Sequence, residues 1–251
     1  MRQYAARARE LGIGELGFSE HIYRLTLAPG AVPWHAGRTG QGDIGGYVSA
    51  AEQVTTEYAR AGGPAVRLSM EVDIVPSTVS ILQAALPLYP FDYLLGSVHE
   101  IPDISAGVGA EDSYRAYYRA IRWACESGLF HSIAHPDRIH RKLDPIPSER
   151  LTPLMEEAAA AMSVKGVCVE LSANGVRRGI VGIDPNRDFV RICFEKGVGI
   201  TLGSDAHKLD DLGVGIAALR DLAWEVGYRE VATFERGRRI DRPLAPPDRT
   251  T

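Results

Sequence analysis

Histidine and carboxylate side chains recur just after the predicted strands of this sequence. In the stretch from Ile200 to His207, an apolar run ends in Ser204, Asp205 and His207. An acid and an imidazole two residues apart, beyond the carboxyl end of a buried strand, face the same pocket. Alone, this pattern also fits Asp205 as a helix cap and His207 as a surface residue. The complete set of such residues is His21, Glu71, His99, His135, Asp205 and His207.

This set of side chains has the ligand chemistry of a metal site. Carboxylates and neutral imidazoles together suit zinc, manganese or iron, whereas a magnesium site holds more oxygen. Taken singly, each histidine also fits a turn cap or a buried structural residue, and Glu71 fits a carboxylate at a helix start. Because four of the seven histidines follow predicted strands, the set as a whole favours a shared site. We expect ordinary roles for the other three, His35, His131 and His140, with contact to the substrate as the alternative for His35 or His140.

Strands and helices alternate along the chain, and this alternation positions the candidate ligands. The predicted strands are Glu15 to Phe18, Val66 to Val72, Asp92 to Val98, Leu129 to Ala134, Val167 to Leu171 and Val198 to Leu202. The predicted helices are Arg2 to Leu11, Tyr47 to Ala61, Pro76 to Leu86, Glu111 to Ser127, Pro147 to Met162, Asp184 to Lys196 and about Leu209 to Val226. Repeated strand–helix units indicate a parallel sheet and favour a closed α/β barrel, with its chemistry at the carboxyl ends of the strands. The Gly/Pro-rich stretch from Ala28 to Gly46 suits a lid or substrate loop.

Composition narrows the class of protein. The 251 residues, 45% hydrophobic and 24% charged, fit one domain spanning 1–251 with a large core. A net charge of -4 argues against a nucleic-acid or membrane surface. The three cysteines have no CxxC spacing and predict reduced thiols in a cytoplasmic protein. Neither a membrane-length apolar run nor a signal-peptide core is present.

The motifs at the strand ends resemble those of the polymerase and histidinol phosphatase (PHP) superfamily, most closely its histidinol-phosphatase branch. The segments that carry the resemblance are Gly17-Phe-Ser-Glu-His21, Glu71-Val-Asp73, Asp92-Tyr-Leu-Leu-Gly-Ser-Val-His99, Ile133-Ala-His-Pro136 and Gly203-Ser-Asp-Ala-His207. The resemblance implies a distorted (β/α)7 TIM-like barrel that holds two or three divalent metal ions (Zn, Mn or Fe). It also implies ligand roles: Glu71 bridging two metals, Asp205 on the first, His99 and His135 on the second, and His21 with His207 on the third.

In one respect the sequence departs from the family pattern. The family begins with a strand that carries a His-x-His motif, and no His-x-His occurs in this sequence. We therefore expect the barrel to lack its first strand and the first metal to lack ligands from that strand. The intact later motifs favour a recorded start at an internal methionine over a decayed enzyme.

The chemistry expected of such a site is hydrolysis of a phosphate monoester. Adjacent divalent cations activate water near neutral pH and neutralise charge on the phosphoryl oxygens. Loop arginines suit phosphate binding through their guanidinium forks, although the same residues also fit solvated loop positions. The residues expected to bind substrate are Arg138, Arg177, Arg178 and Glu20, and those expected to orient a ligand or donate a proton are Asp137 and Glu170.

The function predicted from these residues and the resemblance is metal-dependent hydrolysis of histidinol phosphate, a small-molecule substrate, in histidine biosynthesis. One alternative is another PHP phosphoesterase acting on a different small phosphate ester or a nucleotide. The other is a non-catalytic remnant that binds metal or phosphate. The sequence leaves metal identity and oligomeric state open.

Overall fold

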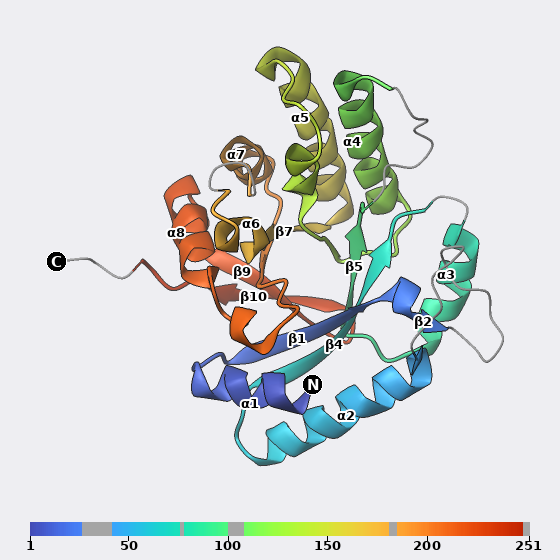
Figure 1. Cartoon of the computed structure of the whole chain (residues 1–251), viewed down its shortest axis with the longest axis vertical. Helices are drawn as coiled ribbons and strands as arrows, with labels where there is room; N and C mark the ends of the chain where they lie inside the picture. The colour runs from blue at the N-terminus through green and yellow to red at the C-terminus, as the bar shows by residue number, and fades with distance from the viewer. Residues whose placement is uncertain (27–41, 76–77, 100–107, 181–184, 248–251) are drawn as a thin grey trace.

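Six parallel strands form a curled sheet at the centre of the molecule (Figure 1). The computed structural model describes residues 1–26, 42–75, 78–99, 108–180 and 185–247. The order of the strands across the sheet follows their order along the chain, with β1 and β8 as its outer strands. Their bounds are β1 Glu15–His21, β4 Ala65–Asp73, β5 Tyr93–Ser97, β6 Ser132–Ile133, β7 Cys168–Ser172 and β8 Ile200–Gly203. The predicted α/β, TIM-like architecture is confirmed, as an open half-barrel of six strands.

Helices cover the outer face of the curled sheet and connect its strands. Figure 1 shows α1 and α2 beside β1 and β4 at one end of the curl, and α7 and α8 near the other. Along the outer face α4 packs on α5, α5 on α7, and α7 on α8. The bounds of the helices are α1 Arg2–Glu10, α2 Ile44–Arg60, α3 Val79–Ala85, α4 Ala110–Glu126, α5 Ser148–Lys165, α6 Ala173–Arg177, α7 Arg187–Glu195 and α8 Ile216–Val226.

Short 3-10 helices and two small strand pairs complete the described chain. The 3-10 helices are η1 Ile22–Arg24, η3 Leu86–Leu88, η4 Pro136–Arg141 and η5 Leu209–Asp211. The strands β2 (Leu25–Thr26) and β3 (Gly42–Asp43) form a short parallel pair. The C-terminal strands β9 (Glu230–Glu235) and β10 (Arg238–Pro243) form an antiparallel hairpin.

The central strands read as apolar runs because both of their faces are covered. All five residues of β7 are buried, as are the last six of β4, from Leu68 to Asp73. The parallel register pairs His21 with Glu71 and Asp73 with Ser97. The sheet therefore brings the ends of β1, β4 and β5 to one level, where their polar residues meet.

Several predicted elements differ from those observed. The predicted strand from Leu129 to Ala134 shortens to Ser132–Ile133. The predicted helix from about Leu209 is wrong in its first half: Gly213 and Gly215, both with positive φ, separate η5 from α8. The helix expected from Asp184, which lies outside the described residues, is capped instead by the side chain of Asn186 at Phe189 N.

The helix α6 and the β9–β10 hairpin were not predicted. The hairpin turns at Arg236 and Gly237, whose φ angles are 50° and 76°. Two successive residues with positive φ are typical of the tight turns that join antiparallel strands. A long loop from Ala28 to Gly46 was expected instead of β3; residues 27–41 lie outside the described chain, and Gly42–Asp43 form β3.

The three cysteines are free and buried, as the sequence predicted. Cys125 lies in α4, Cys168 in β7 and Cys193 in α7, each with no exposed surface. No helix within the described ranges is both long and apolar enough to cross a membrane.

Candidate active site

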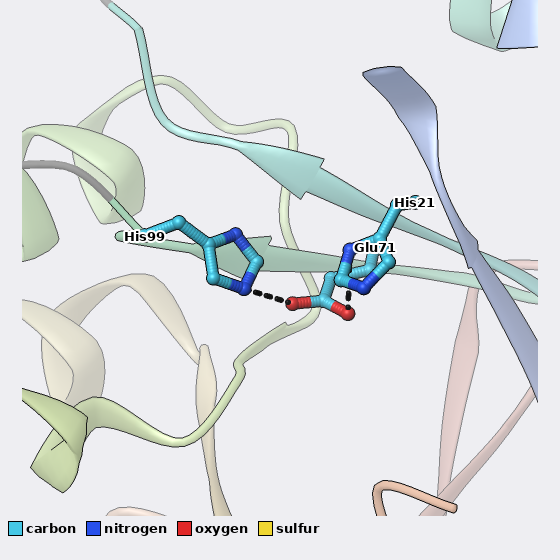
Figure 2. A group of neighbouring side chains, drawn as sticks. All are labelled: His21, Glu71 and His99. Carbon is cyan, nitrogen blue, oxygen red and sulfur yellow. Dashed lines mark ion pairs between the residues drawn. The ribbon is translucent and has the colours of Figure 1, made fainter. Parts of the chain in front are cut away.

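Glu71, near the end of β4, is the centre of the candidate site. Its two carboxylate oxygens are approached by imidazole nitrogens from neighbouring strand ends, as Figure 2 shows for His21 and His99. His21 Nδ1 lies 3.2 Å from Glu71 Oε2, and His99 Nε2 lies 3.3 Å from Glu71 Oε1. One ligand atom from each of these three residues lies within 4.8 Å of the others. The spacing is that of side chains able to share an ion.

A third imidazole reaches the same carboxylate from the end of β6. His135 Nε2 lies 3.0 Å from Glu71 Oε1, and the His99 and His135 ring centroids are 5.2 Å apart. His135 is 3% exposed and Glu71 is 6% exposed. Burial alone would raise the pKa of Glu71, but hydrogen bonding and charge interaction with His135, followed by His21 and His99, lower it to about 2. Glu71 is therefore an ionised carboxylate at neutral pH.

The orientation of His99 is set by Asp73, which lies two residues beyond Glu71 on β4. Asp73 Oδ1 lies 2.7 Å from His99 Nδ1, and Ser97 Oγ lies 3.2 Å from the same nitrogen. A carboxylate only accepts hydrogen bonds, so Nδ1 carries a proton, and Nε2 is the nitrogen of His99 that faces Glu71. A carboxylate behind a histidine in this way is the usual arrangement around a metal ligand. Asp73 was present in the quoted motif, yet it was not predicted as a site residue.

The residues fit a divalent cation. With Nδ1 held by Asp73, the Nε2 of a neutral His99 would present a lone pair to a lone pair of Glu71 at 3.3 Å. This contact is unfavourable unless a proton or a cation lies between the two atoms. Within the described chain, His21 Nδ1 is buried and has no hydrogen-bond partner, although Glu71 Oε2 is near it. Buried imidazole nitrogens directed at a carboxylate form the donor set that zinc, manganese and iron accept.

Asp205 and His207 follow β8 and lie beside this cluster. His207 Nδ1 is 3.5 Å from Asp205 Oδ1, and the His21 and His207 ring centroids are 5.9 Å apart. The side chain of His207 is 52% exposed, whereas that of Asp205 is 12% exposed. All six predicted ligands therefore gather at the carboxyl ends of the strands, with His207 as the most accessible member.

Two of the predicted ligands have left-handed backbone conformations. The φ angle is 31° at His135 and 48° at Asp205, and each residue lies two positions beyond the end of a strand. Outside glycine such conformations are uncommon and cluster at functional sites. The backbone N–H of His135 donates to Glu170 Oε2 at 3.1 Å, which ties this turn to β7.

A group of arginines lies next to Asp205. Asn174 Nδ2 donates to Asp205 Oδ2, while Asn174 Oδ1 accepts from Arg141 Nη1 at 3.1 Å and from Arg178 Nε at 2.7 Å. Burial lowers the pKa of Arg141, and repulsion from Arg138 and Arg178 lowers it further. Arg138 and Arg178 thus lie close enough to Arg141 to repel it, and Arg141 lies close enough to Asp205 to be attracted by it. None of the three arginines is among the described residues that line the cleft containing Glu71 and Asp205.

Arg141 was not predicted as a site residue, although its spacing from Arg138 in the sequence could have indicated it. Arg138 and Arg141 are three residues apart in η4, and residues at this spacing in a 3-10 helix lie above one another. The predicted substrate residue Arg177 has a different environment: its guanidinium donates to the backbone carbonyls of Ser204 and Asp205.

The predicted acidic residues take different positions. Glu170 lines a cleft of about 560 Å³ between β1 and β8, which also includes Glu71, His135 and Asp205. Burial, with repulsion from Asp205 and Glu71, raises the pKa of Glu170 to about 7. Asp137 is buried, and its Oδ2 accepts from Asn186 N at 3.0 Å, at the start of α7. Asp137 is not among the described residues that line the cleft.

The remaining predicted residues make local contacts, and Glu20 also lines the cleft. Glu20 Oε1 accepts from His21 N at 2.9 Å and lies 3.4 Å from Arg24 Nη1. His131 Nδ1 accepts from Leu94 N at 3.0 Å, which matches the ordinary role expected for it. His140 lies between two tyrosine hydroxyls, and His35 falls outside the described residues.

The half-barrel and its histidine–carboxylate cluster define the class to which this chain belongs. Residues 1–174 match the family model of the PHP domain, and the chain is a member of the PHP family.

Named relatives identify a branch of this family. The chain is similar to a probable histidinol-phosphatase of Deinococcus radiodurans, with 30% identity over 243 residues that cover 92% of this chain and 88% of the relative. It is 24% identical to the histidinol-phosphatase of Bacillus subtilis over 247 residues, 87% of this chain and 91% of that protein. Among solved structures, the histidinol phosphate phosphatase of Lactococcus lactis, complexed with Zn, L-histidinol and phosphate, has a TM-score of 0.80 at 21% identity, covering 95% of this chain and 92% of that chain. This likeness supports the fold.

Proposed function

We propose that this protein is a metal-dependent phosphomonoesterase that hydrolyses histidinol phosphate to histidinol and phosphate. The observation that carries the proposal is the convergence of His21, His99 and His135, from three strands, on the two oxygens of Glu71. Asp205 and His207 lie alongside and add a carboxylate and an imidazole to the proposed ligand set, although the His-x-His ligands of the family pattern do not occur in this sequence. The histidinol-phosphatase names of the relatives support the choice of substrate.

Each group of residues has a part in this reaction. Divalent ions, when bound, supply Lewis acidity that activates water and neutralises charge on the phosphoryl oxygens. Glu71 and the imidazoles hold the ions, and Asp73 keeps the Nε2 lone pair of His99 directed inward. Arg138, Arg141 and Arg178 provide the positive charge that a phosphate dianion requires. Hydrolysis adds the oxygen of water to phosphorus, breaks the bond to the alcohol oxygen and leaves a proton on that oxygen.

The two carboxyls predicted as proton donors differ in position. Glu170 lines the cleft together with Glu71 and Asp205, whereas Asp137 faces the start of α7. Glu170 is therefore the better placed to exchange a proton at the leaving oxygen. Asp137 instead supports the segment that carries His135.

Phosphate release by the purified chain tests the proposal. The protein is loaded with Zn²⁺ or Mn²⁺ and assayed with histidinol phosphate, an aryl phosphate and a nucleotide. Preferential turnover of histidinol phosphate, abolished in Glu71→Gln, is the expected result. Glu57→Gln serves as the matched control, because Glu57 makes an exposed ion pair with Arg2 away from the cluster.

Other results of the same assay point to other functions. Preferential hydrolysis of the aryl or nucleotide ester supports a different PHP phosphoesterase. Bound metal without turnover of any ester supports a non-catalytic metal-binding role. Absence of metal binding by the intact protein contradicts the proposal altogether.

A further inference from the structure

The turn that follows β8 holds Asp205 in a rarely populated backbone conformation. Its φ is 48°, a value that side chains other than glycine disfavour. A residue keeps such a conformation only where surrounding contacts impose it. Here the contacts come from α6, the short helix after β7.

Arg177, the last residue of α6, makes contacts on both sides of Asp205. Its Nη1 donates to the carbonyl of Ser204, and its Nη2 donates to the carbonyl of Asp205 at 2.9 Å. The first carbonyl belongs to the peptide plane before the Asp205 Cα, and the second belongs to the plane after it. Fixing these two planes fixes both φ and ψ of Asp205. A planar guanidinium with rigidly spaced donors suits this task, whereas a lysine ammonium has no such fork.

The side chain of Asp205 is held by the same helix. Asn174 Nδ2 donates to Asp205 Oδ2, which leaves Oδ1 on the side of His207 at 3.5 Å from its Nδ1. The side chain of Arg177 is 14% exposed, and its Nε lies 3.8 Å from Asp211 Oδ1. The guanidinium is thus largely enclosed by protein acceptors.

We propose that Arg177 is a positioning residue, which clamps the Ser204–Asp205 turn and thereby aims the Asp205 carboxylate at the metal-ligand cluster. This role rests on the proposed metal site and differs from the substrate contact expected for Arg177 from the sequence. Arg178, the next residue, has its Nε on Asn174 and belongs to the arginine group beside the cluster. The two neighbouring arginines therefore have separable roles.

Metal titration of variants tests the clamp. Zn²⁺ and Mn²⁺ are titrated by calorimetry into metal-free wild type, Arg177→Ala and Arg177→Lys. Removal of a side chain that orients a metal ligand typically weakens metal binding about 10–100-fold. We therefore expect the metal affinity of Arg177→Ala to fall by that factor, or the variant to bind one equivalent of metal fewer. The metal affinity of Arg177→Lys is expected to lie between those of the wild type and Arg177→Ala. Guanidinium ion at a non-denaturing concentration is expected to restore metal binding to Arg177→Ala, and urea at the same concentration is not.

Two further arginine variants separate the clamp from other effects. Arg187→Ala removes an exposed ion pair with Glu225 on α7 and is expected to leave metal affinity unchanged. Arg178→Ala is expected to weaken inhibition by inorganic phosphate and, because Arg178 reaches Asp205 only through Asn174, to lower metal affinity less than Arg177→Ala does. Arg177→Ala is expected to show the reverse pattern. Its metal affinity is lower in the titration, and its inhibition by phosphate, assayed at saturating metal, changes little.

The outcomes are distinguishable. Wild-type metal affinity in Arg177→Ala, with phosphate inhibition lost, overturns the clamp and makes Arg177 a substrate contact. Absence of metal binding by the wild type refutes the proposed function instead. If Arg177→Ala does not fold, Arg177→Lys and Arg177→Gln carry the test, and wild-type affinity in both refutes the inference.

Discussion

At the scale of single residues, the site depends on the directions in which imidazole nitrogens point. Glu71 is surrounded by three imidazoles, and Asp73 determines which nitrogen of His99 faces it. The carboxylate behind the ring selects the tautomer and makes the opposite nitrogen a better donor to a cation. A cation between these groups replaces a contact that is unfavourable without it.

Replacing Asp73 is expected to weaken metal binding without unfolding the protein. In Asp73→Asn the charge behind His99 is lost, so we expect zinc affinity to fall about 10–100-fold, as measured by competition with a chelator. The control is Asp92→Asn: Asp92 accepts from Leu68 N and Arg236 N and lies outside the cluster. That variant is expected to lower the free energy of unfolding and keep wild-type zinc affinity. Equal affinity in Asp73→Asn and wild type contradicts the role of Asp73.

At the scale of elements, β7 and β8 are fitted together through a glycine. A Cβ at residue 203 would lie 2.6 Å from Glu170 Cδ and would overlap the carboxyl oxygen as well. Glu170 in turn accepts from His135 N and holds the turn after β6. Gly203 on β8 thus leaves room for the side chain of Glu170 on β7, which supports His135 in the turn after β6.

Gly203→Ala tests this coupling. The added methyl group must displace a buried carboxyl, so we expect a loss of about 1–3 kcal/mol in the free energy of unfolding, measured with urea. Metal affinity should fall with it, because the support of His135 is disturbed. In the double variant with Glu170→Ala, the cost of Gly203→Ala should largely disappear. Additive losses in the double variant would show that the two residues are not coupled.

A second coupling joins η4 to α4 through a buried histidine. His140 Nδ1 is 3.2 Å from Tyr114 Oη, and its Nε2 is 3.3 Å from Tyr118 Oη. Burial lowers the pKa of His140 to about 4, below its usual value of 6.5. Because the unfolded chain binds the proton more readily, stability from this group is complete above pH 6.5 and declines as the pH falls towards 4.

The pH dependence of unfolding measures this effect. Between pH 7.5 and pH 4.5, His140 is expected to account for up to about 3 kcal/mol of lost stability. His140→Phe should show a correspondingly shallower decline in urea denaturation at the same series of pH values. His131→Phe is the comparison variant: His131 bonds to the backbone of β5 and burial lowers its pKa too, so this variant should remove a separate part of the decline. An identical pH slope in wild type and His140→Phe would refute the assignment.

At the scale of the whole molecule, the candidate ligands join distant parts of the chain. They extend from His21 to His207, and each lies near or just beyond the end of a different strand, except that Asp205 and His207 both follow β8. A bound ion therefore connects both outer strands of the half-barrel to its centre. Binding to the folded state alone stabilises that state by mass action.

Metal removal is expected to lower the melting temperature. At a free-metal concentration about a hundredfold above Kd, binding adds about 2.7 kcal/mol, which corresponds to roughly 5–10 °C for a chain of this size. Differential scanning fluorimetry with EDTA, followed by re-addition of Zn²⁺ or Mn²⁺, measures this shift. Glu71→Ala should melt at the same temperature with and without metal. A wild-type melting temperature that is insensitive to EDTA contradicts a structural contribution from the ions.

The sequence predicted those features that depend on strand ends. Apolar runs followed by His21, Glu71, His99 or His135 located the cluster, because parallel strands bring their carboxyl ends to one edge. The environment of Arg177 was not predictable, since nothing in the Asn174–Arg178 region indicates that one guanidinium points at a backbone turn and the next at an amide. Long-range packing decides between these two environments.

The boundaries of helices and strands were less predictable in short polar segments. The β9–β10 hairpin was not predicted, although Arg236 and Gly237 form a tight turn. The break before α8 depends on Gly213 and Gly215, whose positive φ ends a pattern that otherwise continues as a helix. In both places a local backbone conformation overrides the periodic pattern.

The placement of the three cysteines has a practical consequence. Burial raises the pKa of the Cys125 thiol to about 12 and that of Cys168 to about 11, so the reactive thiolate is scarce at neutral pH while the protein is folded. Each thiol becomes available to an alkylating reagent only when its own element opens. The alkylation rates of Cys125, Cys168 and Cys193 therefore report separately how often α4, β7 and α7 open. No added probe is needed for this measurement.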